Sequence, residues 1–244
     1  MSFASSSIVR RVSNWHMGFL NNCLVFGQAM LPQQCLLCAA PAVAKPVCDA
    51  CYADLPWLPD ARCPQCAVPT ADGGICGACL SHPPRFDRVS AAFVYAWPLA
   101  PLIHHYKYAG HLALATLLAQ ALSARLAGDA DLIIPMPLAP QRLLSRGFNQ
   151  ALEIARVVSR ATGVPLAAKA CRRVRDTAPQ ASLPWRERAQ NIRGAFVCDA
   201  DLQGKRVAVI DDVMTTGATL NELARNLRLA GALEIQGWMV ARTL

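Results

Sequence analysis

Two adjacent aspartates, Asp211 and Asp212, stand in the stretch VAVIDDVMTTGATL, residues 207–220. An apolar run precedes them, and threonines with one glycine follow them. After such a turn, backbone N–H groups, hydroxyls and a helix N-terminus can converge on a phosphate dianion. The carboxylates would repel that phosphate, so they need other partners, such as vicinal sugar hydroxyls or a magnesium ion. A ribose 5-phosphate satisfies both halves of the stretch.

A structural explanation of the same residues stays open, in which the carboxylates cap the helix of an ordinary strand-turn-helix unit. A phospho-aspartyl receiver site does not fit, because such a site would not carry a phosphate cradle in the same turn. The chain has neither GxxxxGK nor GxGxxG, the glycine patterns of the Walker loop and the dinucleotide fold.

Eight of the eleven cysteines form four CxxC pairs. Nine residues separate the pairs within each half, and the second half repeats the first after 28 residues. A CxxC turn offers two thiolates to a tetrahedral zinc ion, and a second turn completes the site. Four thiolates leave no open position, so two structural zinc sites are expected, paired sequentially or cross-braced. The expected ligands are Cys35, Cys38, Cys48, Cys51, Cys63, Cys66, Cys76 and Cys79.

The remaining cysteines, Cys23, Cys171 and Cys198, are expected to be ordinary small or buried thiols. The chain has 244 residues, of which 54% are hydrophobic and 16% charged, which is enough for a sizeable buried core. Its net charge of +8 favours polyanionic partners, among them phosphorylated metabolites and nucleic acid.

Three parts are expected along the chain. Residues 1–31 are interpreted as an amphipathic helical segment, because polar residues interrupt an apolar run too short to span a membrane. Residues 32–84 carry the double zinc ribbon, which ends at Pro83 and Pro84. Residues 85–244 form the main domain. No membrane insertion is expected, and the predicted location is cytoplasmic.

Strand-like and helix-like segments alternate in the main domain. The alternation predicts an α/β fold with a mostly parallel sheet, which binds ligands at the carboxyl ends of its strands. Two segments lie at such ends, residues 135–147 (PMPLAPQRLLSRG) and 211–219. The expected strands are residues 89–97, 131–138, 204–213 and 234–244, and the expected helices are residues 111–128, 149–163 and 219–231.

The stretch VIDDVMTTGAT resembles the phosphoribosyl pyrophosphate (PRPP) motif of type I phosphoribosyltransferases. Together with the CxxC module, the segments HHYKYAGH, PMPLAPQRLLSRGFNQ and RRVRDTAPQASLPWRERAQNIRGAF resemble the ComF family of competence-related proteins. The likeness covers nearly everything from Cys35 onward. It implies a type I phosphoribosyltransferase fold with a small N-terminal double zinc-ribbon module.

The resemblance implies roles for particular residues. Asp211 and Asp212 would be catalytic and hold the ribose hydroxyls or their magnesium ion. The nearest cations for the pyrophosphate are Arg142, Arg146 and Lys107. The 5-phosphate would lie on Thr215, Thr216, Gly217, Ala218 and Thr219. A mobile loop closing over the site would carry Arg172, Arg173, Arg175, Arg186 and Arg188, or these arginines form a solvated basic loop or a nucleic-acid contact.

Three functions are compatible with this resemblance. The first is binding of PRPP with magnesium, with transfer of the phosphoribosyl group to an unknown acceptor in connection with DNA uptake. The second is a non-catalytic protein that binds single-stranded DNA or serves as an adaptor, for example with a competence helicase. The third is an accessory protein of sugar or nucleotide metabolism. His104, His105 and His111 are assigned no catalytic role.

Overall fold

The computed structural model describes residues 34–43, 45–175 and 192–244. It divides into two compact units, one ending at Asp49 and one running from Ala50 to the C-terminus. The helical segment expected over residues 1–31 lies outside the described residues. The domain limits expected from the sequence, near residues 31 and 84, stay predictions.

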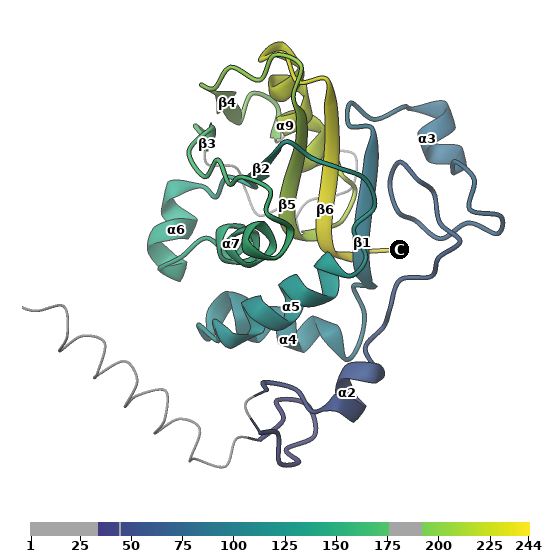
Figure 1. Cartoon of the computed structure of the whole chain (residues 1–244), viewed down its shortest axis with the longest axis vertical. Coiled ribbons are helices and arrows are strands. Elements are labelled where there is room, and N and C mark those ends of the chain that lie inside the picture. The colour runs from purple at the N-terminus through teal and green to yellow at the C-terminus, as the bar shows by residue number, and fades with distance from the viewer. Residues whose placement is uncertain (1–33, 44, 176–191) are drawn as a thin grey trace, which may run out of the picture. The chain divides into compact units, whose positions relative to one another are not determined.

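A four-stranded sheet forms the centre of the larger unit (Figure 1). Its order is β1 (Arg88–Val94), β6 (Glu234–Arg242), β5 (Arg206–Met214) and β2 (Leu132–Pro135), and every neighbouring pair is parallel. Central parallel strands are covered on both faces, so they are buried along nearly their whole length, as β6 is. The predicted α/β architecture with a mostly parallel sheet is confirmed.

Helices cover the two faces of this sheet (Figure 1). On one side lie α5 (Ala113–Ser123) and α7 (Gln150–Thr162), which pack on each other and on the strands. On the other side α9 (Ala218–Leu229) joins the core that contains alternate residues of β5. A Cβ atom at Gly237 would lie 2.7 Å from Leu220 Cδ2, so the absence of a side chain there lets α9 approach β6.

Some elements were not expected from the sequence. Residues before and after the strand β2 form the helices α4 (Leu99–Tyr108) and α6 (Pro140–Arg146). Proline at the first position presets the backbone of α6, and Gly147 ends it in the left-handed region with φ 78°. A separate antiparallel pair consists of β3 (Cys171–Arg173) and β4 (Phe196–Cys198).

The 28-residue repeat of the cysteine pairs is also a repeat of backbone structure. Isolated bridges join Gln34 to Pro41 in the first copy and Arg62 to Pro69 in the second. Short helices follow at the same spacing, α2 (Asp49–Ala53) and α3 (Gly77–Ser81). The equivalent alanines, Ala39 and Ala67, both adopt positive φ, 59° and 61°. The first CxxC turn of each copy is therefore followed by a residue in the same left-handed conformation.

The second copy of this repeat is built into the core of the larger unit. Cys63, Cys66 and Cys79 belong to one buried cluster with residues of β1, β5 and α9. Backbone hydrogen bonds attach the surrounding segment to β1, from Leu58 N to Ala92 O at 2.9 Å and from Val89 N to Pro64 O at 3.2 Å. The second ribbon and the sheet consequently share apolar contacts.

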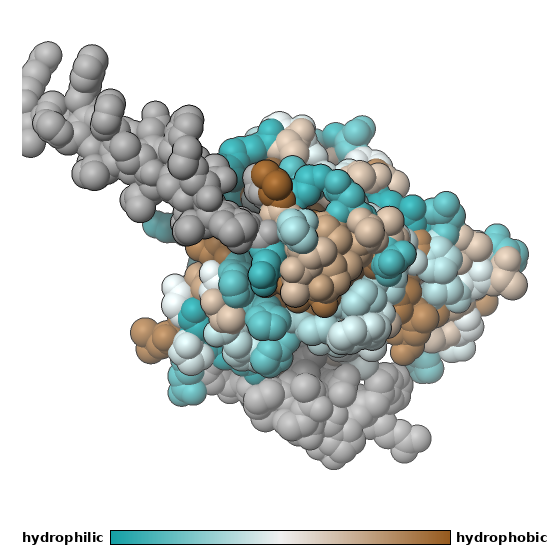
Figure 2. Space-filling model, turned by 90° about the horizontal axis from the view of Figure 1, so that it is seen from below, coloured by the Kyte–Doolittle hydropathy of each residue, from teal (hydrophilic) through white to brown (hydrophobic). Residues whose placement is uncertain are grey.

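Thirteen large hydrophobic side chains are exposed among the described residues. Figure 2 shows one face on which strongly hydrophobic residues lie apart from one another among hydrophilic ones. The most exposed large hydrophobic residues are Leu144, Val43 and Trp97, with 85%, 84% and 77% of their surface accessible. Among the residues that the structure describes, no helix combines the length and apolar character needed to cross a bilayer.

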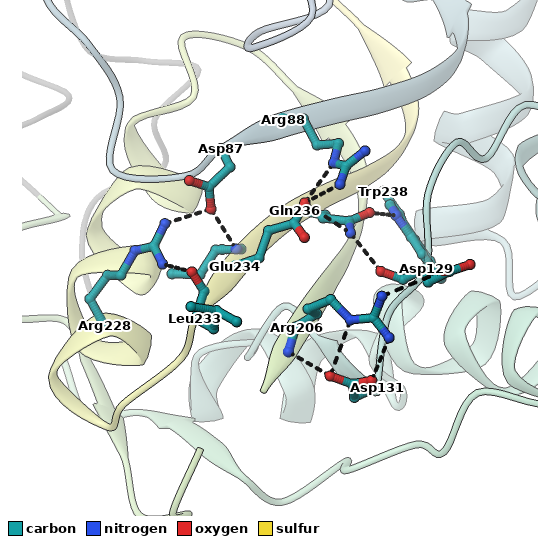
Figure 3. Close-up of polar contacts among 11 residues, drawn as sticks. Asp87, Arg88, Asp129, Asp131, Arg206, Arg228, Leu233, Glu234, Gln236 and Trp238 are labelled. Atoms are coloured by element: carbon teal, nitrogen blue, oxygen red, sulfur yellow. Dashed lines mark hydrogen bonds and ion pairs between the residues drawn. The ribbon is translucent and has the colours of Figure 1, made fainter. Parts of the chain in front are cut away.

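Ion pairs and hydrogen bonds fasten the amino ends of the strands (Figure 3). Arg206 contacts both carboxylate oxygens of Asp131, its guanidinium approaching to 2.8 Å, and these contacts lower the pKa of Asp131 to about 2. Arg88 pairs with Glu234 on the neighbouring strands. These charged residues at the amino ends of the strands are therefore paired with one another, whereas the predicted site lies at the carboxyl ends of the strands.

Candidate functional site

A cavity of about 150 Å³ opens at the carboxyl ends of β2 and β5. Asp211 and Asp212, near the end of β5, contribute its two carboxylates. The expected pyrophosphate residues come from two other helices, since Lys107 belongs to α4 and Arg142 and Arg146 belong to α6. The structure therefore brings together residues more than one hundred positions apart in the sequence. The remaining lining residues are Met136, Pro137, Leu138, Asn149, Gln150, Ala151, Arg173 and Thr219.

Lys107 and Asp212 form an ion pair within this cavity, with Nζ 2.9 Å from Oδ2. The Lys107 side chain is 20% exposed and that of Asp212 only 9%. Burial alone lowers the pKa of Lys107, but the charge and hydrogen bond of Asp212 outweigh it and the net pKa is raised. Lys107 therefore carries its positive charge at neutral pH.

Asp211 is half-buried and has a different electrostatic environment from its neighbour. Burial and the adjacent Asp212 charge raise the pKa of Asp211 to about 7, while Lys107 acts in the opposite direction. One Asp211 carboxylate oxygen accepts a hydrogen bond from the Asp212 backbone N–H at 2.9 Å. At neutral pH, Asp211 can thus be present as acid or as carboxylate, and a nearby cation would favour the carboxylate.

A smaller cavity of about 40 Å³ adjoins the first, and Asp211 and Thr219 line both. The loop between β5 and α9 contributes Thr215 and Gly217 to it. Gly217 has φ 79°, a conformation that favours glycine; a Cβ atom there would lie 2.7 Å from the terminal methyl of Met214, which would have to move aside. The first N–H groups of α9 have no acceptor within the helix.

Of the other residues expected to bind the 5-phosphate, Thr216 and Ala218 lie in the same loop and helix start. The Thr216 hydroxyl accepts a hydrogen bond from the Ala218 backbone N–H at 3.3 Å. This contact links the loop to the first residue of α9, whose N-cap is Gly217. The five residues predicted to bind phosphate are consecutive, three in the loop that follows β5 and two at the start of α9.

The segment RGFNQ, residues 146–150, connects α6 to α7 beside the larger cavity. Asn149 caps α7 by accepting from the N–H groups of Ala151 and Leu152, and its amide donates to Met136 O at 3.1 Å. Arg146 donates to the Gln150 side chain at 3.0 Å. The segment therefore fixes both the end of β2 and one of the cationic side chains.

Asn149 and Gln150 had no separate role in the sequence analysis. Gln150 is 3% exposed, its carbonyl accepts from the Tyr106 hydroxyl at 2.8 Å, and its side-chain Nε2 has no hydrogen-bond partner among the described residues. Asn before a helical pattern is a recognisable capping signal. Burial of Gln150 had no sequence signal, because it depends on packing against α4.

The arginines of the expected mobile loop divide into three groups. Arg173, on β3, lines the larger cavity, and its charge acts on Asp211. Arg172 is exposed and pairs instead with Asp199 at 2.8 Å, and Arg175 donates to Arg193 O at 2.6 Å. Arg186 and Arg188 lie outside the described residues.

The eight CxxC cysteines gather into two groups of four, Cys35, Cys38, Cys48 and Cys51 in one and Cys63, Cys66, Cys76 and Cys79 in the other. Within each group all sulfur atoms lie within 4.8 Å of one another. Sulfurs of Cys38 and Cys48 are 3.8 Å apart, and those of Cys66 and Cys76 are 3.6 Å apart. A tetrahedral zinc ion with Zn–S bonds of about 2.3 Å requires sulfurs about 3.8 Å apart. Consecutive pairs thus form two groups that fit structural zinc.

Backbone N–H groups lower the pKa of the first cysteine of each group. Burial raises the pKa of Cys35, but donors at Leu37, Cys38 and Cys48 outweigh it and lower the pKa to about 6. The equivalent donors 28 residues later lower the pKa of Cys63 to about 7, again against burial. Zinc binds thiolates, so these turns favour the protonation state that the metal needs.

Arg242, the last residue of β6, connects the second cysteine group to the loop between β5 and α9. It is 7% exposed and donates to Cys66 O at 2.8 Å and to Met214 O at 3.2 Å. The same guanidinium also donates to the carbonyl of Thr215. A single buried cation therefore joins a CPQC turn to the loop after β5.

Residues 26–80 match the family model described as a double zinc ribbon domain. With the sheet and the two cysteine groups, this match defines the class, an α/β protein that carries a double zinc ribbon. DNA utilization protein YhgH of Shigella flexneri is 36% identical over 173 residues, covering 68% of this chain and 76% of that protein. Competence protein F of Haemophilus influenzae is 35% identical over 175 residues, covering 67% and 76%. The chain belongs to the ComF family of competence and DNA utilization proteins.

A solved structure similar to this chain is glutamine phosphoribosylpyrophosphate amidotransferase from B. subtilis, complexed with ADP and GMP. It is 24% identical, with a TM-score of 0.36, and the alignment covers 50% of this chain and 25% of that one. A likeness at this TM-score carries no argument about function.

Proposed function

We propose that the larger unit is a type I phosphoribosyltransferase-like domain that binds PRPP with magnesium at the two adjoining cavities. The observation that supports this most is the placement of the phosphate loop next to Asp211, with cations of α4, α6 and β3 on the other walls of the larger cavity. A molecule with a phosphate at one end, vicinal hydroxyls in the middle and a pyrophosphate at the other end matches this order.

In this proposal the smaller cavity takes the 5-phosphate. Thr215, Gly217 and Thr219 line it, and the α9 N-terminus offers backbone donors to an anion. Asp211 and Asp212 accept hydrogen bonds from the ribose hydroxyls. Lys107, Arg142 and Arg146 surround the pyrophosphate, with Arg173 facing them from β3.

The donor set also fits magnesium, which prefers carboxylate and phosphate oxygens. When bound, the ion would neutralise part of the charge on the pyrophosphate. Without ligand, the Lys107 ammonium neutralises the Asp212 carboxylate. When a bound cation neutralises Asp212 instead, the Lys107 side chain can turn toward the pyrophosphate. Transfer of the phosphoribosyl group to an acceptor is the reaction that such a site supports, because arginines and Lys107 stabilise the departing pyrophosphate.

Calorimetric titration of magnesium PRPP into the zinc-loaded protein tests this proposal. The wild type should bind, and the Asp211→Asn, Asp212→Asn double variant should lose binding. A matched control is the Asp129→Asn, Asp201→Asn double variant, which removes the same charge at two exposed positions away from the cavities. Absence of binding by a folded wild type would overturn the proposal.

Binding of single-stranded DNA is the second candidate, since relatives of this chain are named for DNA utilization and competence. Arg146 lies 5.0 Å from the ring centre of the exposed Tyr108, and stacking next to a cation is a feature of single-strand binding. Fluorescence anisotropy with a labelled single strand should show affinity that falls steeply with salt. Binding unaffected by Tyr108→Ala and Arg146→Ala would exclude this surface.

The cytoplasm is the compartment that we propose, because it keeps thiols reduced and available to zinc. If single-stranded DNA is the ligand, we propose a competence helicase as partner. If PRPP is the ligand, we propose a role in sugar or nucleotide metabolism.

A further inference from the structure

Two cysteines outside the zinc groups face each other across the β3–β4 pair. Cys171 and Cys198 are direct partners in its antiparallel register. Backbone hydrogen bonds flank them, from Asp199 N to Ala170 O at 3.0 Å and from Val174 N to Ala195 O at 2.8 Å. Because bonded and non-bonded pairs alternate along an antiparallel ladder, Cys171 and Cys198 occupy a pair without hydrogen bonds between them.

This position has the geometry of a disulfide. Opposite residues in a non-hydrogen-bonded antiparallel pair have Cα atoms about 4.5 Å apart, and their side chains leave the same face of the ribbon. Disulfides accept Cα separations of about 4.4 to 6.8 Å. The two sulfurs can therefore reach bonding distance by side-chain rotation, with the strands in place.

The two thiols differ in access. Cys171 is 5% exposed, whereas Cys198 is half-buried and its Sγ lies 3.8 Å from Ala200 O. Burial raises the pKa of Cys171, and the Cys198 thiol raises it further. A reagent in solution therefore reacts first with Cys198, and Cys171 is the buried thiol that reacts second.

We propose that Cys171 and Cys198 form a dithiol modification site, which a low-molecular-weight disulfide oxidises to a cross-strand disulfide. The Cys198 thiolate attacks the reagent disulfide and displaces one reagent thiolate, which leaves a mixed disulfide on Cys198. Cys171 then loses its proton and attacks the Cys198 sulfur, displacing the second reagent thiolate. Two protein thiols become one disulfide, and the reagent disulfide becomes two thiols.

The bridge would join the two ends of the arginine-rich segment. Cys171 and Cys198 stand on either side of residues 172–197, and Arg173, which lines the larger cavity, is two positions from Cys171. A disulfide removes conformational freedom from the chain that it closes. The site is separate from the cysteine groups that fit zinc, whose eight members are all different residues.

The test uses the zinc-loaded full chain with Cys23→Ser, since Cys23 is the one remaining cysteine of the sequence. The protein is treated with oxidised glutathione, denatured, alkylated and digested, and its peptides are identified by mass spectrometry. We expect a cross-linked peptide that joins Cys171 to Cys198, a loss of two hydrogen atoms and an unchanged zinc content.

Two single variants distinguish the order of the steps. Cys171→Ser should stop at a glutathione adduct on Cys198, and Cys198→Ser should leave Cys171 reduced in the folded protein. Recovery of both wild-type thiols as alkylated cysteines, or a lasting adduct on wild-type Cys198, would overturn the proposal. Neither variant changes a residue that lines the cavities, so the result is independent of PRPP binding.

Discussion

The two aspartates of the β5 motif lie in the same strand but differ in their partners. Asp212 is buried against Lys107, whereas Asp211 is half-buried between that ion pair and the loop that joins β5 to α9. Two carboxylates this close resist simultaneous ionisation, and the pKa of Asp211 is the one raised, to about 7. Asp211 is thus the carboxyl group whose protonation responds to pH near neutrality.

Affinity for magnesium PRPP should therefore depend on pH. Because the pKa of Asp211 is raised from 3.8 to about 7 by folding, the free energy of unfolding decreases as pH rises through this range. A bound cation or pair of hydroxyls favours the carboxylate form of Asp211 and offsets this decrease. If only the carboxylate binds, affinity should increase about tenfold between pH 6 and pH 8. Calorimetry across this range measures the slope.

The phosphates of the ligand also titrate, so the Asp211→Asn variant is the control. The affinity of this variant, measured at high ligand concentration, varies with pH only through the titration of the ligand, because Asp211 no longer titrates. Equal slopes for the variant and the wild type would assign the whole effect to the ligand and contradict this prediction.

Lys107 should contribute to folding as well as to binding. Lys107→Met leaves the buried Asp212 carboxylate without its cation, and the free energy of unfolding should fall by about 2 kcal/mol, less than for a fully buried pair. Adding Asp212→Asn to this variant should restore part of the loss, because the uncompensated charge is removed. Urea denaturation of the two single variants and the double variant measures the coupling.

At the scale of elements, the alanine that follows the first CxxC turn of each copy has a conformation that alanine does not favour. Ala39 has φ 59°, in the left-handed region, and its side chain is exposed. Ala39→Gly should relieve about 1 kcal/mol of backbone strain and strengthen zinc binding about fivefold. Competition with a chromophoric chelator measures the change.

The matched control is Ala40→Gly, also exposed but without positive φ. Glycine there only adds freedom to the metal-free chain, so zinc binding should weaken slightly. An equal gain in both variants would mean that the left-handed conformation is not the cause.

The β5–loop–α9 unit was recognisable from the sequence because its chemistry is local. Asp211, Asp212 and the Thr-Gly loop are consecutive, and the cysteine spacing predicted two sites of four cysteines, whereas the sequential membership of each site came from the structure. Local patterns could not show that Lys107 pairs with Asp212, because α4 meets β5 only through the fold. The β3–β4 pair was missed for the same reason, since its three-residue strands carry no usable periodicity.

For the molecule as a whole, the two cysteine groups should differ in their effect on stability. Cys63, Cys66 and Cys79 are part of the buried cluster of the larger unit, and Arg242 joins Cys66 to the loop between β5 and α9. Cys66→Ser should therefore lower the melting temperature of the zinc-loaded larger unit, whereas Cys38→Ser, in the first group, should leave it nearly unchanged. Scanning calorimetry of the two variants measures this, and equal losses would contradict it.

The 28-residue repeat, with its matching left-handed alanines and bridges, indicates descent by tandem duplication of one small metal-binding unit. After such an event the copies come under different constraints. The descendant built around Cys63 and Cys66 must stay compatible with the core residues that it contacts, so its sequence can drift only together with theirs. The copy built around Cys35 and Cys38 is outside that cluster and has to retain its metal ligands and its own buried residues Ala42 and Val47, which leaves its exposed residues available for selection on new partners.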